Sequence, residues 1–169
     1  MGSQLDQVLE KQKEQIQNSD NPLHEDESED IMQLVGFIVG NEEYAIPILA
    51  IQEIIKPIVY TRVPSTPDYV LGVFNLRGNV LPLIDLRSKF HLRSQNETAD
   101  TRYIVMKDGD SVAGFVIDKL TEAIRLKTSE VDLAPETIRK EKGVIAGIGK
   151  RKNSILTILK VNQLLKRDF

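Results

Sequence analysis

The segment VLGVFNLRGNVLPLIDL, residues 70–86, decides the predicted fold. Apolar residues run along both halves of it, and Arg77 and Gly78 interrupt the apolar run near its middle. Two apolar segments of strand length, joined by two residues that include a glycine, predict a β-hairpin. We therefore expect Gly78 to relax the backbone of the turn and the charged side chain of Arg77 to point outward.

Similar short apolar segments, separated by turn residues, fill the chain after residue 32. The segment GKRK at 149–152 is expected to be an exposed turn. Many short strands with turns between them are typical of an all-β protein built from closed barrels, rather than of an α/β protein. Strands are predicted at 33–39, 44–48, 50–55, 70–76, 79–86, 102–106, 111–118, 120–126, 144–149 and 154–159, with a short helix at 160–168.

A faint internal repeat divides the chain. The segment FIVGNEEYAIPILAIQEII from Phe37 resembles YIVMKDGDSVAGFVIDKLTEAI from Tyr103, and LPLIDL at 81–86 has the apolar pattern of LTILKV at 156–161. The repeat predicts two similar small barrels packed together, because a barrel of this size buries too little surface to be stable alone. The groove where the barrels meet is the first candidate for a functional surface.

The composition is that of a globular protein of one domain or two small ones, with 169 residues, 41% hydrophobic and 28% charged. The chain has no cysteine, which excludes disulfides, thiolate metal ligands and cysteine nucleophiles. No apolar segment approaches the roughly 18 residues that span a bilayer. The first residues lack the basic and apolar parts of a signal peptide. We therefore expect a cytoplasmic protein that is not inserted into the membrane.

Residues 1–31 are predicted to form an acidic extension ahead of a folded unit at 32–169. Residues 1–30 hold nine acidic residues against two lysines, a net charge of −7, which leaves +4 on the remainder because the whole chain carries −3. That mild positive charge is too scattered to predict a nucleic-acid surface. The apolar spacing permits a short helix over 4–16, and the acidic segment after it is expected to be disordered. The extension is either a solvated tail or a helix that docks transiently on a partner.

Few residues support catalysis. The two histidines, His24 and His91, lie far apart in the sequence, and neither stands near a plausible nucleophile. The segment GVIAGIGKR at 143–151 departs from a phosphate-binding loop in its glycine spacing, and Arg151 replaces the Ser or Thr that would hold magnesium. We therefore expect no enzyme activity, no metal site, no cofactor and no small-molecule substrate.

Two charged residues lie inside apolar segments, Glu53 in AIQEIIKP and Arg77 in the opening hairpin. A charge in such a place is either an outward-facing strand position or a polar contact at an interface with a partner. Strand periodicity alone leaves both interpretations open.

Three segments resemble the CheW family of chemotaxis coupling proteins. They are EEYAIPILAIQEI at 42–54, TPDYVLGVFNLRGNVLPLIDLRSKF at 66–90 and AGFVIDKLTEAI at 113–124, in this order. The middle segment carries the pattern GxxNLRGxxxPxxDLRxxF, which is long and therefore specific. The resemblance covers about residues 33–168.

The resemblance implies two SH3-like five-stranded β-barrels with short helices, one of them at the C-terminal end. It also implies a non-catalytic adaptor that bridges the cytoplasmic tips of chemoreceptors to the regulatory domain of the histidine kinase CheA. Such a protein is recruited from the cytoplasm to membrane-associated receptor arrays. A helical receptor tip would dock in the groove between the barrels.

The resemblance also implies roles for individual residues by their position in the motifs. Ala123 is smaller than the valine that the family often carries there, and Ala45 replaces a more usual glycine. Partner contacts are expected at Ile51, Glu53, Ile54, Arg77, Leu120 and Ala123, and turn or packing roles at Gly72, Gly78 and Gly114.

Two other functions remain open. One is the coupling domain of a CheV-type protein, which would need a separate receiver domain after Phe169. The other is an SH3-like peptide-binding module of unrelated function, although the chain has no tryptophan and only 5% aromatic residues to line a peptide groove.

Overall fold

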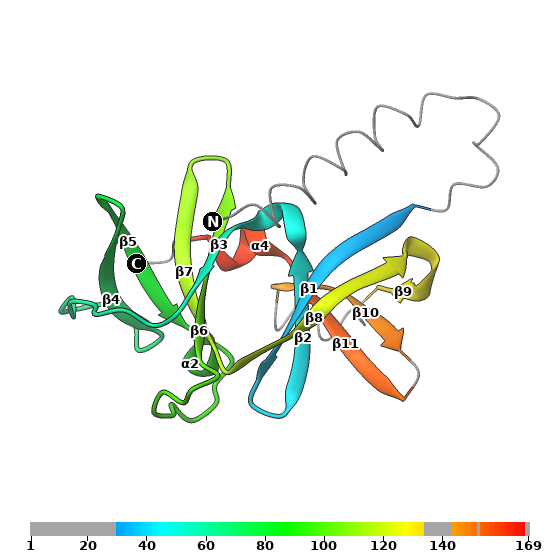
Figure 1. Cartoon of the computed structure of the whole chain (residues 1–169), viewed down its shortest axis with the longest axis horizontal. Coiled ribbons are helices and arrows are strands. Elements are labelled where there is room, and N and C mark those ends of the chain that lie inside the picture. The colour runs from blue at the N-terminus through cyan, green and yellow to red at the C-terminus, as the bar shows by residue number, and fades with distance from the viewer. Residues whose placement is uncertain (1–29, 134–142, 152, 168–169) are drawn as a thin grey trace.

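The computed structural model describes residues 30–133, 143–151 and 153–167. These residues form two curved β-sheets that lie side by side as small barrels (Figure 1). We call the sheet with strand order β8-β1-β2-β11-β10-β9 barrel A, and the sheet with order β3-β6-β7-β5-β4 barrel B. The predicted all-β fold of two packed barrels is confirmed. Barrel A carries the two-residue strand β9 in addition to five longer strands.

Barrel A closes through the connection from β8 to β9. These strands follow each other in the chain, across the short 3-10 turn η3 (Thr128–Glu130), but they lie at opposite ends of the strand order. An exposed turn was predicted at 149–152. This prediction is wrong for 149–151, because these residues lie in a strand, where Lys150 and Arg151 pair with Ile155 and Ser154. The strands of barrel A are β1 (Ile31–Val39), β2 (Glu42–Pro47), β8 (Lys119–Lys127), β9 (Val131–Asp132), β10 (Ile145–Arg151) and β11 (Ser154–Leu159).

Barrel B closes where Thr61, beyond the end of β3, pairs with Val73 of β4. Two-residue loops connect its hairpins at 77–78 and 109–110, as the turn signals predict. The short helix α4 (Val161–Leu164) lies within the helix predicted at 160–168, whereas helix α2 (Leu86–Lys89) falls partly in a predicted strand. The strands of barrel B are β3 (Ile51–Ile55), β4 (Val70–Leu76), β5 (Asn79–Asp85), β6 (Arg102–Asp108) and β7 (Ser111–Ile117), with the 3-10 turn η2 (Ile48–Ala50) before β3.

The internal repeat is present, but its strands are exchanged between the barrels. The first repeat places the β1–β2 hairpin in barrel A and β3, β4 and β5 in barrel B. The second repeat places the β6–β7 hairpin in barrel B and its remaining strands in barrel A. In each barrel, a hairpin of one repeat pairs in parallel with a strand of the other, β2 with β11 and β7 with β5. Neither half of the chain therefore forms a barrel by itself.

Three apolar clusters stabilise this arrangement. One lies among the strands of barrel A, around Leu34 and Leu156, and one among those of barrel B, around Phe74 and Tyr103. The largest cluster joins the two barrels and includes Leu164 of α4, which lies between them (Figure 1). The junction, where a groove was expected, thus contains a continuous core.

The first described residue, Asp30, lies near the end of the predicted acidic extension. The extension was predicted at 1–31, and its residues 1–29 lie outside the described residues. Strand β1 begins at Ile31, one residue before the predicted boundary of the folded unit. In the described part of the chain, no helix has the length and apolarity to cross a membrane.

Candidate functional site

The turn between β4 and β5 holds Arg77 in an unusual backbone conformation. Arg77 has a φ of 52° and Gly78 a φ of 87°. Two successive positive φ angles define the type I′ turn, whose twist matches that of the strands it joins. The Asn75 side chain accepts a hydrogen bond from the Gly78 N–H at 2.9 Å and so stabilises the turn. The predicted turn is confirmed, and it carries Arg77 at its tip.

The structure brings together the two charged residues that lie inside apolar segments. The Arg77 guanidinium donates a hydrogen bond to the Glu53 carboxylate at 2.8 Å. The Arg77 side chain is 78% exposed and that of Glu53 is 22% exposed. An ion pair this accessible contributes little to stability, about 0 to 1 kcal/mol. It does fix the orientation of two charges at the edge of barrel B, where β3 and the β4–β5 turn approach each other.

Strand β8 of barrel A is the structural counterpart of β3. Ile51 and Ile54 of β3 lie opposite Met106 and Ile104 of β6. Leu120 and Ala123 of β8 lie opposite Phe37 and Val35 of β1. When the turn of the β1–β2 hairpin is superimposed on that of the β6–β7 hairpin, Phe37 and Val35 coincide with Met106 and Ile104. The two segments with implied partner contacts, 51–54 and 120–123, therefore occupy equivalent positions in the two barrels.

The counterpart of Glu53 also forms an ion pair with an arginine. This residue is Glu122, and its carboxylate accepts a hydrogen bond from Arg151 at the end of β10. Arg151 also lies 3.5 Å from Glu43 of β2. Sequence reasoning missed this second pair, although the repeat aligns the EII of β3 with the EAI of β8.

The remaining candidates differ in accessibility. Ile54 and Leu120 are half-buried and pack against the shared core, whereas Ala123 is exposed. Ile51 is only 1% exposed and belongs to that core. The expected partner contact of Ile51 thus requires correction, because its side chain points into the core rather than to the surface.

The three glycine candidates serve local geometry. Gly78 occupies the turn described above. A Cβ atom on Gly114 would lie 2.7 Å from the Phe74 ring, so the absence of a side chain lets that ring pack against β7. A Cβ on Gly72 would lie 2.1 Å from the Thr61 carbonyl oxygen, at the point where barrel B closes.

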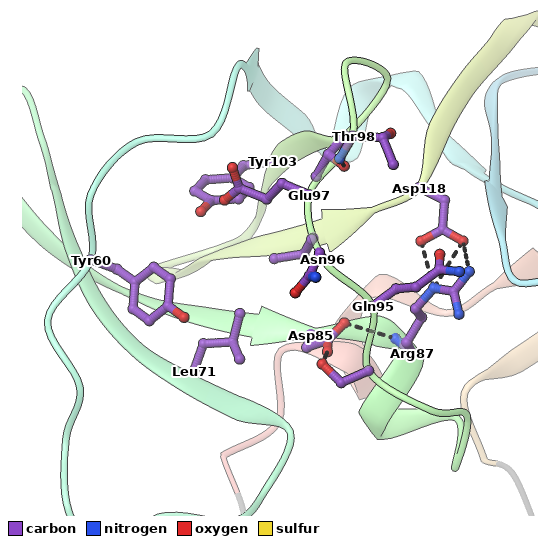
Figure 2. A pocket seen from close by; sticks show the side chains of 13 residues that line it. Tyr60, Leu71, Asp85, Arg87, Gln95, Asn96, Glu97, Thr98, Tyr103 and Asp118 are labelled. Carbon is purple, nitrogen blue, oxygen red and sulfur yellow. Dashed lines mark hydrogen bonds and ion pairs between the residues drawn. The ribbon is translucent and has the colours of Figure 1, made fainter.

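A polar pocket of about 260 Å³ lies beside barrel B, and none of the candidates lines it (Figure 2). On one side of it Arg87 makes a paired contact with Asp118, with Nε–Oδ1 and Nη2–Oδ2 distances of 2.9 and 2.6 Å. This hydrogen bonding raises the pKa of Arg87. Asp118 also accepts a hydrogen bond from the Gly40 N–H at 2.8 Å. The pair therefore connects α2 with the β1–β2 turn of barrel A.

Asp85 is a buried carboxylate at the same pocket, only 5% exposed. It accepts hydrogen bonds from the Arg87 N–H at 3.1 Å and from the Ser88 hydroxyl at 3.0 Å, which caps α2. Sequence reasoning missed both Asp85 and Arg87 as structural residues, although they form the DLR part of the long motif. Among the described residues, no group of three His, Asp or Glu side chains is placed to hold a metal ion.

Two buried tyrosines, Tyr44 and Tyr103, have raised pKa values. Burial, together with a hydrogen bond from its hydroxyl to Glu42, raises the pKa of Tyr44. Burial raises the pKa of Tyr103 to about 12, and the negative charge of Glu97 contributes to the same shift. The Tyr103 hydroxyl donates to the Ile58 carbonyl oxygen at 3.3 Å.

The raised pKa of Tyr103 predicts a loss of stability in alkali. An unfolded tyrosine loses its proton near pH 10, whereas folded Tyr103 keeps its proton up to about pH 12. The unfolded state then binds fewer protons, so the free energy of unfolding falls between these two pH values and is unaffected below pH 10. Urea unfolding from pH 8 to 11.5 should show the decrease, and Tyr103→Phe should reduce its slope. An unchanged slope in that variant would contradict the assignment.

The fold defines a class, the small proteins built from two packed β-barrels. The chain belongs to the CheW-like family, because the family model described as "CheW-like domain" matches residues 33–169. The chain is 53% identical over 169 residues to the chemotaxis protein CheW of Helicobacter pylori, and the match covers 100% of both chains. It is 36% identical over 137 residues to the CheW of Bacillus subtilis, covering 80% of this chain and 88% of that one.

A solved structure agrees with this assignment. The scaffolding protein TtCheW from Thermoanaerobacter tengcongensis superposes with a TM-score of 0.72 at 27% identity, over 76% of this chain and 88% of that one. The resemblance seen in the sequence is confirmed, and the protein is a chemotaxis scaffold of the CheW-like family.

Proposed function

We propose that this protein couples chemoreceptors to the histidine kinase CheA. In this role it is a non-catalytic adaptor in the cytoplasm, recruited to membrane-associated receptor arrays by its two partners. The observation that carries the proposal is the 53% identity to a chemotaxis protein CheW along the whole chain. The repeated surface around β3 and β8 supports it, since two similar surfaces suit a protein that holds two partners at once.

The proposed contacts follow from what the surface offers. Ile54 and Leu120 present partly exposed apolar side chains at the rim of the shared core, and Ala123, three residues after Leu120 in β8, adds a small exposed one. Such residues suit the apolar stripe of a helical receptor tip. The Glu53–Arg77 pair offers two oriented charges, which favour specificity over affinity at the edge of an interface.

A reconstituted assay tests the proposal. Receptor cytoplasmic fragments and the kinase are combined with and without this protein, and ATP turnover is measured. Coupling predicts a rise in kinase activity that requires all three components. A kinase activity that is the same with and without receptor in the complete mixture would contradict the proposed function.

A further inference from the structure

The connection between β3 and β4 exposes a row of apolar side chains. We call Ile58, Val59, Tyr60 and Val63 the loop patch. Val59 is 91% exposed. Thr61 holds the middle of this segment against β4 through two backbone hydrogen bonds with Val73, at 2.7 and 2.8 Å. Contiguous apolar side chains that are exposed on a fixed backbone are typical of a surface that another segment covers.

Basic residues border the loop patch. Lys56 and Arg62 are both exposed, and among the described residues neither has an ion-pair partner. Tyr60 also lines the polar pocket, whose lining includes the acidic Glu97 (Figure 2). The outer side of the patch therefore suits a segment that combines apolar and acidic residues.

The corresponding connection in barrel A has the opposite charge. Thr61 pairs with Val73 next to Gly72, just as Asp132 pairs with Ile148 next to Gly147. The residues around Asp132 include Glu130 and the exposed Leu133. Charge thus distinguishes two connections that are otherwise equivalent, and only that of barrel B attracts an acidic segment.

The chain itself contains a segment with the required chemistry. Residues 1–29 carry eight acidic residues against two lysines, together with a helically spaced apolar set that includes Leu5, Leu9 and Ile16. A segment of 29 residues reaches much farther than the roughly 30 Å diameter of a small domain. The match with the Helicobacter pylori CheW extends over this segment, whereas the Bacillus subtilis match covers only 80% of the chain.

We propose that residues 1–29 dock on the loop patch of the same chain. Their apolar residues cover Val59 and its neighbours, and their acidic residues face Lys56 and Arg62. The proposal does not depend on the proposed coupling function. It adds a regulatory element, because a partner that binds barrel B at this connection has to displace the acidic segment first.

A single spin label tests the proposal in the chain of 169 residues. The chain contains no cysteine, so Ser19→Cys creates one unique attachment site. Paramagnetic broadening of amide signals is then compared with the same sample after chemical reduction of the label. Docking predicts that signals of 58–63 lose most of their intensity, while those of the matched connection at 128–133 keep theirs. Equal broadening at both connections, or none at 58–63, would overturn the proposal.

Two variants and a mixing experiment separate the causes. Val59→Asp, at a position too exposed to affect folding, and the pair Lys56→Glu with Arg62→Glu should each remove most of the broadening at 58–63. If the signals of 58–63 stay broadened in both variants, the label approaches the loop patch without these contacts, and the proposal is rejected. Mixing labelled protein without nitrogen-15 and unlabelled protein with nitrogen-15 should give no broadening. Broadening in the mixture would mean that the segment binds a second copy instead.

Discussion

Replacing Gly72 with alanine is expected to lower the free energy of unfolding by roughly 3 kcal/mol or more. The new Cβ would lie 2.1 Å from the Thr61 carbonyl oxygen and 3.0 Å from the Arg62 Cα, and both atoms belong to the backbone. A backbone cannot rotate away as a side chain can, so the Thr61–Val73 pairing that closes barrel B would open. For a protein of this size the loss corresponds to a fall in Tm of about 6–12 °C.

Two other glycines serve as matched controls for this prediction. Gly147 is the counterpart of Gly72 in barrel A, and a Cβ there would meet the Val131 side chain at 2.8 Å and the Asp132 carbonyl oxygen at 3.0 Å. Small movements relieve these contacts, so Gly147→Ala should be less harmful than Gly72→Ala. Gly109 has open space around it and a φ of 61°, so Gly109→Ala should lose only about 1 kcal/mol. A fall in Tm for Gly72→Ala that is no larger than the fall for Gly109→Ala would contradict this prediction.

Reversing the charge of Glu53 or Arg77 is expected to reduce receptor-dependent kinase activation roughly tenfold or more, equivalent to losing about 1.4 kcal/mol or more of interaction with a partner. Stability should change little, because the exposed pair contributes at most about 1 kcal/mol. The variants are Glu53→Arg and Arg77→Glu, and the measurements are ATP turnover in the reconstituted mixture and thermal unfolding. Glu130→Arg, the same change at an exposed acid of barrel A, should retain coupling.

The double variant Glu53→Arg with Arg77→Glu decides what the pair does. It keeps an ion pair but exchanges the positions of the two charges. If a partner recognises each charge where it stands, the double variant remains inactive. Full recovery of coupling would show instead that the pair only connects β3 to the β4–β5 turn, and its role would then be structural. Unfolding of the single variants would lead to the same conclusion.

The sequence predicted the strands well because their signals are local. The predicted strands at 70–76 and 154–159 agree with β4 and β11 residue for residue. The turn at Arg77 and Gly78 was also predicted, since two residues including a glycine, between two apolar strands, favour a type I′ turn. Helix α2 was missed because it is only four residues long and begins at Leu86, which continues the apolar pattern of β5.

The candidate site was predicted less well, because burial and partners depend on distant parts of the chain. Ile51 and Ile54 lie in the same short apolar segment, yet the first is in the shared core and the second at its rim. The contact of Arg87 with Asp118 spans 31 residues, and nothing in either segment indicates the other. The family resemblance pointed to Glu53 and Arg77 separately, and only the structure shows that they form a pair.

By itself, the sequence determined that this protein is all-β, repeated, and without the residues for a thiolate metal site or a disulfide. Strand periodicity and turn chemistry act over a few residues, so they can be recognised without the fold. The tertiary structure alone decided that β3 and β8 cross to the opposite barrels and that the barrels share one core. The alternation of apolar residues reports that one face of a strand is buried, but not which strand lies beside it. That choice follows from packing the two repeats together, which also places two Glu–Arg pairs at equivalent edges of the barrels.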